Sequence, residues 1–118
     1  MIRLDLPWPP TLNTLYPTSR SGHRYLSAKG KTYVANVRKA FSAQTLNHTP
    51  WNDRVGYRLR FLPPDRRARD LPNHIKAIED SLTKCGLWVD DSQVDDGHFT
   101  RGPVVKGGRV EMEVWKIV

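Results

Sequence analysis

The sequence predicts a small α/β domain with a mixed β-sheet and two main helices, in the order β-α-β-α-β-β. Three observations lead to this class. Short stretches in which apolar and polar residues alternate, as in half-buried strands, lie near both ends and in the middle of the chain. Between them are two longer stretches whose apolar residues recur every three or four positions, as in helices. Prolines and glycines gather at the joins.

Four segments are predicted to be strands. In residues 2–6 and 55–61 apolar and polar side chains alternate, and prolines follow each segment. Residues 94–101 are also predicted to be a strand, although Gly97 interrupts the pattern. The last strand covers residues 110–118 and follows a Lys-Gly-Gly-Arg turn.

Two helices are predicted between these strands. Ser27 is placed to cap the first helix, which runs to about Leu46 and carries apolar residues at helical spacing. Asp70 is placed to cap the second helix, and Pro72 lies in its first turn, where the missing N–H does no harm. Gly86 is suited to end the second helix.

The second helix has two distinct sides, because successive helical residues turn by about 100°. The buried side is predicted to carry Ile75, Ile78, Leu82 and Cys85. The opposite, polar side carries Lys76 and Asp80 one turn apart and within reach of each other, with Asn73 and Lys84.

Other segments are given simpler interpretations. Residues 11–24 are rich in asparagine, proline, serine and glycine and are predicted to form an irregular loop. His74 is expected to be an exposed helix residue, since the histidines show no metal-site spacing. Trp88 is expected to pack in the core, and Asp95 and Asp96 are interpreted as part of a turn.

Composition limits the classes of function. The 118 residues are interpreted as one domain, residues 1–118, and the low hydrophobic share of 38% is consistent with a core completed by a subunit interface. Cys85 is the only cysteine, and no signal peptide or membrane-spanning run is found, so a cytoplasmic location is expected. The 19 lysines and arginines exceed the 12 acids, and the formal charge of +7 favours a polyanionic partner such as nucleic acid.

Charges of both signs lie close together from Asp65 to Asp91. This pattern fits a solvated charged helix. It also fits a site that holds a divalent metal against a phosphate, because magnesium prefers carboxylate oxygens while lysine and arginine neutralise phosphate oxygens. Phosphodiester hydrolysis needs such groups, and Asp70, Lys76 and Asp91 are the candidate catalytic residues.

A set of short motifs extends along nearly the whole chain: Leu-Pro-Trp-Pro-Pro at 6–10 with Asn13, Pro64, Arg69-Asp70-Leu71, Asn73, Lys76, Asp80-Ser81-Leu82-Thr83-Lys84, Gly86, Trp88-Val89-Asp90-Asp91, Gln93-Val94 and Lys106-Gly107-Gly108-Arg109. With these motifs the chain resembles the RusA family of Holliday-junction resolvases, found in bacteria and their prophages. The resemblance implies a homodimeric, Mg²⁺-dependent endonuclease, with Mn²⁺ as a substitute, that binds four-way DNA junctions and makes paired nicks. It further implies that Asp70 and Asp91 are metal-binding catalytic carboxylates and that Lys76 is the catalytic lysine.

One position departs from the family pattern. The better-known pattern is Asp-Leu-Asp-Asn, whereas residues 70–73 read Asp-Leu-Pro-Asn, and proline has no side chain that can ligate a metal. Either the site works with fewer ligands, helped by Asp90, Asp80 or Asn73, or the protein binds junctions and cleaves them poorly. Asp90 adjoins Asp91, but neighbours on a strand point to opposite faces, which argues against a shared metal.

Several cations are candidate DNA contacts. Arg66, Arg67 and Arg69 are placed to bind phosphates near the cleaved bond, although Asp65 and Asp70 could simply offset their charge. Further candidates for a basic surface are Arg20, Arg24, Lys29, Lys31, Arg58 and Arg60.

Two other functions stay open at this point. One is a junction-binding architectural protein without useful nuclease activity, which the proline in the motif favours. The other is a general binder of single-stranded nucleic acid, which rests on net charge alone.

Overall fold

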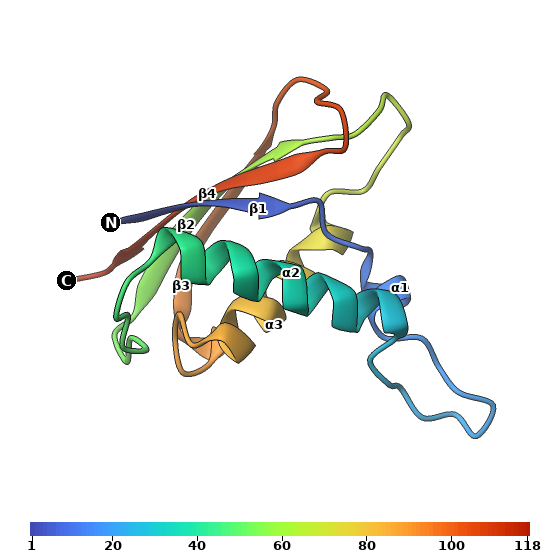
Figure 1. Cartoon of the computed structure of the whole chain (residues 1–118), viewed down its shortest axis with the longest axis horizontal. Coiled ribbons are helices and arrows are strands. Elements are labelled where there is room, and N and C mark those ends of the chain that lie inside the picture. The colour runs from blue at the N-terminus through green and yellow to red at the C-terminus, as the bar shows by residue number, and fades with distance from the viewer.

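The computed structural model describes residues 1–118, and its four strands form one mixed sheet (Figure 1). The strand order is β1-β4-β2-β3, with β4 antiparallel to β1 and β2, and with β3 parallel to β2. The predicted α/β class and order of main elements are confirmed, with one short helix added. The elements are β1 (Ile2–Pro7), α1 (Leu12–Leu15), α2 (Ala28–Gln44), β2 (Val55–Leu62), α3 (Pro72–Cys85), the 3₁₀ turn η1 (Asp91–Gln93), β3 (Val94–Arg101) and β4 (Arg109–Lys116).

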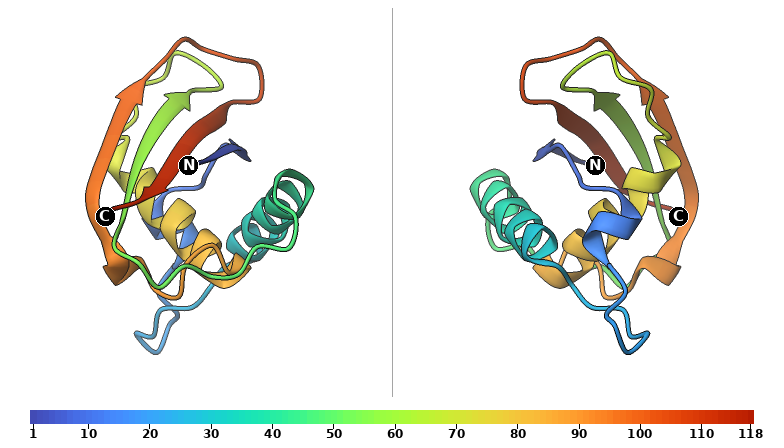
Figure 2. Two further views of the ribbon diagram at one scale, coloured as in Figure 1. Left: turned by 90° about the vertical axis from the view of Figure 1, so that its left-hand side faces the viewer. Right: turned by 90° about the vertical axis from the view of Figure 1, so that its right-hand side faces the viewer.

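Helices α2 and α3 cover the same face of the sheet (Figure 2). On the central strand β2, the side chains of Tyr57, Leu59 and Phe61 are buried in the core beneath these helices. Because side chains alternate along a strand, Arg58 and Arg60 lie on the opposite, open face. The predicted basic side of this strand is therefore the side away from the helices.

The buried side of α3 differs in part from the prediction. Ile78 and Leu82 are fully buried as expected, but Ile75 and Cys85 are only partly buried. The most buried stripe includes His74, so its predicted exposure is wrong. His74 is 4% exposed, its Nδ1 lies 2.9 Å from the carbonyl oxygen of Pro9, and burial lowers its pKa.

The start of α3 also differs from the prediction. Pro72 occupies the first turn as expected, but Leu71 holds the N-cap position and no side chain caps the helix, so the assignment of Asp70 as the cap is wrong. Leu71 is buried, and its helical backbone begins the turn before the proline. Asp70 contributes its carbonyl oxygen, which accepts a hydrogen bond from Asn73 N–H at 3.1 Å. Gly86 ends the helix with a φ of 86°, as glycine favours.

Ser27 caps α2 as predicted, since its Oγ accepts a hydrogen bond from Gly30 N–H at 3.0 Å. The irregular loop predicted for residues 11–24 is wrong in part, because Thr11 caps the one-turn helix α1. The turn interpretation of Asp95 and Asp96 is also wrong. Both lie in β3, the edge strand of the sheet, and Asp95 forms an ion pair with Arg54.

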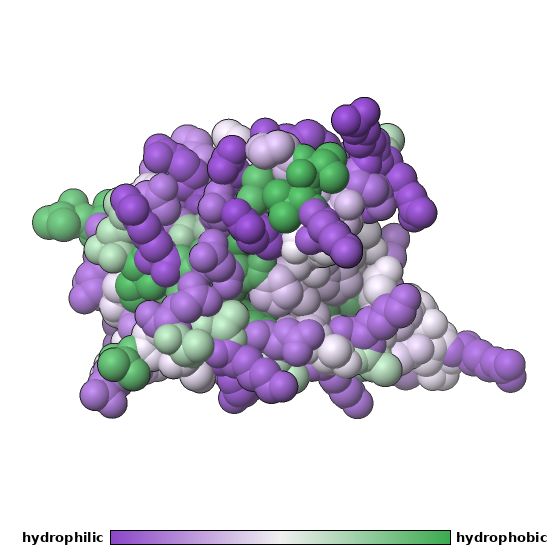
Figure 3. All heavy atoms as spheres, turned by 45° about the horizontal axis from the view of Figure 1, so that its top comes forward, coloured by the Kyte–Doolittle hydropathy of each residue, from purple (hydrophilic) through white to green (hydrophobic).

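Hydrophilic side chains cover most of the face shown in Figure 3, and apolar side chains form separate patches between them. The charge of the chain is thus carried on a folded surface. None of the helices combines the length and apolar character needed to cross a membrane.

Candidate active site

Lys76 lies between two carboxylates on the polar side of α3. Its Nζ is 3.0 Å from Asp80 Oδ1, one helical turn away, and 2.7 Å from Asp91 Oδ2, at the start of η1. The hydrogen bond to Asp91 is the main reason that the pKa of Lys76 is raised above its usual range, so the side chain stays cationic at neutral pH. These residues line an open pocket of about 280 Å³ with Tyr16, Thr83, Lys84 and Asp90.

A buried tryptophan and a capped turn hold Asp91 beside Lys76. Trp88 is 1% exposed, as its predicted packing role requires, and its Nε1–H donates to Thr83 Oγ1 on α3 at 2.7 Å. Asp90 caps the 3₁₀ turn, and Gln93 completes the capping box. Asp90 and Asp91 therefore lie at a turn and not along a strand. The argument that strand alternation separates the two carboxylates does not apply, and both line the pocket.

Tyr16 is a residue of the site that sequence reasoning did not assign. Its hydroxyl donates a hydrogen bond to Asp80 Oδ2 at 2.8 Å, across 64 residues of sequence. Burial and this hydrogen bond raise the pKa of Tyr16 to about 12, so the phenol stays protonated and remains a donor. Tyr16 directly follows α1, and no spacing in the sequence connects this position with Asp80.

Glu79 is a further carboxylate next to this cluster. It is partly buried and accepts a hydrogen bond from the Tyr57 hydroxyl at 2.9 Å. Burial raises the pKa of Glu79, and the charge of Asp91 acts in the same direction. Sequence reasoning missed this residue because Tyr57, which holds it, comes from the sheet beneath α3.

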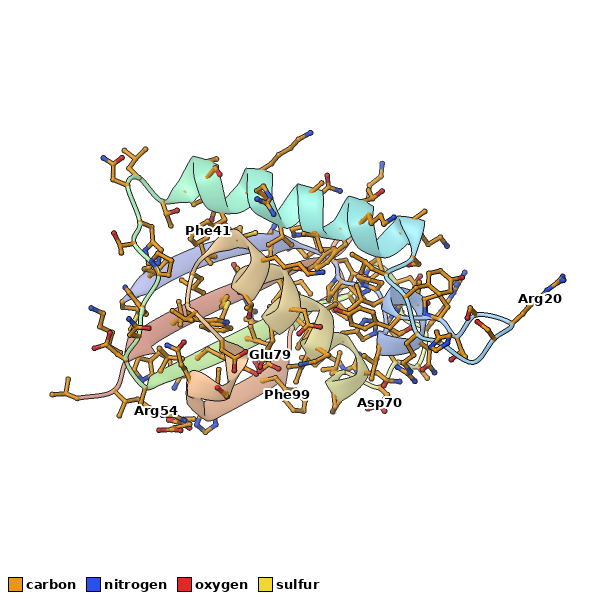
Figure 4. The ribbon with its side chains drawn as sticks, turned by 90° about the horizontal axis from the view of Figure 1, so that it is seen from below. Arg20, Phe41, Arg54, Asp70, Glu79 and Phe99 are labelled. Carbon is orange, nitrogen blue, oxygen red and sulfur yellow. The ribbon has the colours of Figure 1, made fainter.

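Asp70 is not among the residues that line this pocket. It is exposed at the start of α3, and Figure 4 shows it at one end of the helix, with Glu79 further along. No ion pair of the structure includes Asp70, whereas Asp80 and Asp91 both pair with Lys76. The structure brings together two of the three predicted catalytic residues, Lys76 and Asp91, and it confirms the predicted contact between Lys76 and Asp80.

The carboxylate oxygens of the pocket are ligands that a hard metal ion prefers, although they do not form a complete coordination shell. No group of three or more histidine, cysteine, aspartate or glutamate side chains is arranged to hold a metal ion. Magnesium is commonly held by only one or two carboxylates, with waters and substrate phosphates as its other ligands. Asp91, with Asp80 or Asp90 nearby, can supply such a partial set.

The three arginines before α3 differ in their surroundings. Arg69 is largely buried, with its Nη1 2.6 Å from Asp65 Oδ1 and its guanidinium 5.6 Å from the centre of the Trp8 ring. The hydrogen bond from Arg69 lowers the pKa of Asp65 to about 2. Arg66 and Arg67 are exposed, although Arg67 lies 3.7 Å from Asp65.

The other candidate cations lie in three places. Arg58 and Arg60 are on the open face of the sheet, where Arg60 pairs with Glu111 at 2.9 Å. Lys29 and Lys31 are exposed near the start of α2, and Arg20 and Arg24 are exposed between α1 and α2.

A basic α/β domain that holds a lysine between two carboxylates, on a helix preceded by an arginine-rich segment, has the features of an enzyme that acts on nucleic acid. The family described as Endodeoxyribonuclease RusA matches residues 7–115. The chain therefore belongs to the RusA family of endodeoxyribonucleases, as the sequence motifs predicted.

Individual relatives agree with this assignment. The crossover junction endodeoxyribonuclease RusA of Enterobacteria phage 82 is 41% identical over 114 residues, which cover 94% of this chain and 91% of the relative. The protein of the same name from Escherichia coli strain K12 gives the same identity and coverage. That of Escherichia coli O139:H28 is 38% identical over 117 residues, which cover 97% of this chain and 93% of the relative.

Proposed function

We propose that residues 1–118 act as one RusA-type domain that cleaves four-way DNA junctions by hydrolysing phosphodiester bonds. The observation that carries this proposal is the cationic Lys76 held by Asp91 in an open pocket. It occurs in a chain that is 41% identical, over 94% of its length, to crossover junction endodeoxyribonucleases.

Lys76 is suited to stabilise negative charge on the phosphate that is attacked. Asp80 and Asp91 fix its ammonium group from two sides, which reduces the reorganisation needed when charge develops. The ammonium group is cationic at neutral pH, which suits an electrostatic role at the phosphate. Tyr16 supports this arrangement through its hydrogen bond to Asp80. Trp88 supports it by anchoring the segment before Asp91 to Thr83 on α3.

Asp70 and Asp91 are the proposed ligands of a Mg²⁺ ion, with Asp80 or Asp90 as a further ligand and Mn²⁺ as a substitute. A bound divalent ion activates water and neutralises charge on the phosphate. Asp91 faces the pocket, and Asp70 is exposed at the helix start, where DNA can reach it.

The exposed Arg66 and Arg67 are proposed to bind phosphates beside the site, while Arg69 shapes the segment through Asp65 and Trp8. We further propose a homodimer, because a junction requires two symmetric incisions and a two-fold axis supplies them. Such an enzyme would work in the cytoplasm, on bacterial or phage DNA.

A specific observation favours one alternative, a protein that binds junctions without cutting them. Pro72 stands where the family pattern has an aspartate, and no three-carboxylate cluster replaces it. In that case Lys76 and the arginines would serve binding alone.

The experiment is a comparison of four-way junction, duplex and single-stranded DNA at matched salt, with binding and nicking followed in the same samples. We expect preferential binding of the junction, nicking with Mg²⁺ but not with EDTA, and binding without nicking for Asp91→Asn. Junction binding without nicking in either Mg²⁺ or Mn²⁺ would establish the architectural alternative. Equal affinity for all three DNAs would contradict both junction-specific functions.

A further inference from the structure

Residues 17–25 form a hairpin that projects from the domain. Thr18 and Arg24 form an antiparallel bridge, and Ser19 N–H donates to the carbonyl oxygen of His23 at 2.7 Å. Gly22, with a φ of 86°, closes the tip. The hairpin extends away from the helices and sheet in Figures 1 and 2, and Figure 4 places Arg20 near its far end.

The hairpin adds almost nothing to the core. The tip and the returning strand, residues 20–25, are exposed throughout, including the aromatic ring of Tyr25, which is 51% exposed. Because these side chains are not used in the core, they are available to a molecule outside the domain.

The charge of the chain is concentrated in the part that contains this hairpin. Residues 6–52 hold six lysines and arginines and no aspartate or glutamate, whereas residues 53–118 hold twelve cations and eleven acids. Nearly all of the formal charge of +7 thus comes from the segment that spans α1, the hairpin and α2. None of the ion pairs in the structure involves Arg20, His23 or Arg24.

The base of the hairpin is fixed to the wall of the candidate active site. Tyr16, the residue before the hairpin, donates its hydroxyl hydrogen to Asp80, which pairs with Lys76. The returning strand is tied to the outgoing one by the Tyr25 N–H, which donates to the carbonyl oxygen of Pro17 at 3.2 Å. A molecule bound along the hairpin would therefore lie next to the pocket.

We propose that the hairpin of residues 17–25 is a DNA-binding arm, in which Arg20 and Arg24 bind phosphates of the junction beside the cleavage site. This inference rests on the proposed function. A polyanion fits the arm because Arg20 and Arg24 have no carboxylate partner and can bind phosphates. The exposed ring of Tyr25 offers an aromatic face to an unpaired base at the branch point.

The test compares two double variants that remove the same charge from exposed positions. Arg20→Gln/Arg24→Gln alters the arm, and Arg38→Gln/Lys39→Gln alters the middle of α2, where neither cation has an ion-pair partner. Affinity for a synthetic four-way junction is measured by fluorescence anisotropy in EDTA, from 50 to 200 mM salt. Sedimentation velocity on the free proteins reports any change of subunit association.

Each phosphate contact adds about 0.9 to the slope of log affinity against log salt. Loss of two contacts should make the slope about 1.8 shallower, so that the fourfold rise in salt weakens the arm variant about tenfold less than the unchanged protein. The α2 variant should keep the original slope. Equal slopes for the two variants, or a change of subunit association confined to the arm variant, would overturn the inference. Equal affinity of the unchanged protein for junction, duplex and single-stranded DNA, in the comparison proposed above, would instead overturn the proposed function, and the arm's role with it.

Discussion

Gln93 connects the turn at the start of η1 to the segment before β2, and its loss should weaken the whole domain. The side chain is 8% exposed. Its Oε1 accepts hydrogen bonds from Val89 N–H and Asp90 N–H at 3.0 and 2.8 Å, and its Nε2 donates to the carbonyl oxygens of Trp51 and Asp53 at 2.7 and 2.9 Å. Gln93→Ala therefore removes the partners of four backbone groups at once.

The expected loss follows from these four bonds. A typical internal hydrogen bond contributes about 0.5–1.5 kcal/mol to stability, which gives roughly 2–6 kcal/mol for the set. Because water can reach part of the turn, we expect Gln93→Ala to lower the free energy of unfolding by about 3 kcal/mol. A domain of this length loses about 4 °C of melting temperature per kcal/mol, so the midpoint should fall by about 12 °C.

Thermal unfolding followed by circular dichroism at neutral pH measures this change, with Gln44→Ala as the matched control. Gln44 also bonds to the backbone of two segments, through Asp5 and Ala40, but it is exposed. Water can replace its bonds, and its loss should cost less than about 1 kcal/mol. If the two variants melt within about 2 °C of each other, the reasoning about Gln93 is refuted.

Three further predictions concern the site and its support. Lys76→Gln should lower the cleavage rate at saturating protein by about 100-fold or more, because it removes a fixed positive charge at the phosphate. Lys84→Gln, which alters another lysine of the same pocket, should have a much smaller effect. Single-turnover kinetics measure both rates. The hydrogen bond from Arg69 lowers the pKa of Asp65 from its ordinary 3.8 to about 2. The ionised Asp65 therefore stabilises the fold fully above pH 3.8, and this stabilisation is lost as the pH falls from 3.8 through about 2. Melting temperatures from pH 7 to 2 should show this loss, and Asp65→Asn should abolish it. Trp88→Ala should cost about 3–5 kcal/mol in a urea titration, because it empties a fully buried position, and a cost below about 1 kcal/mol would contradict its packing role.

The regular elements could be predicted because their patterns are local. The alternation of β2 and the three- to four-residue spacing of α2 and α3 depend only on neighbouring residues. α1 was missed because four residues are too few to show a helical period. The predicted buried side of α3 began at Ile75, one residue after the position that is buried in the structure, His74. The partner of the His74 ring, the carbonyl oxygen of Pro9, is distant in the sequence and could not be inferred from local spacing.

The site could be predicted in part for the same reason. Lys76 and Asp80 are neighbours by helical spacing, and the family motifs identified Asp91. Tyr16 and Glu79 could not be found, because each is held by contact with a residue far away in the sequence. The start of α3 was also misplaced, because Leu71 and not Asp70 holds the N-cap position and no side chain caps the helix.

The most direct test of the central claim is to map the nicks on a four-way junction whose strands are labelled one at a time, in Mg²⁺ and in EDTA. We expect nicks at symmetry-related positions in two strands of like polarity, present with Mg²⁺, absent with EDTA and lost in Asp91→Asn. Tight junction binding with no nick in any strand, in Mg²⁺ or Mn²⁺, would contradict the assignment of Lys76 and Asp91 as the centre of a junction-cleaving site.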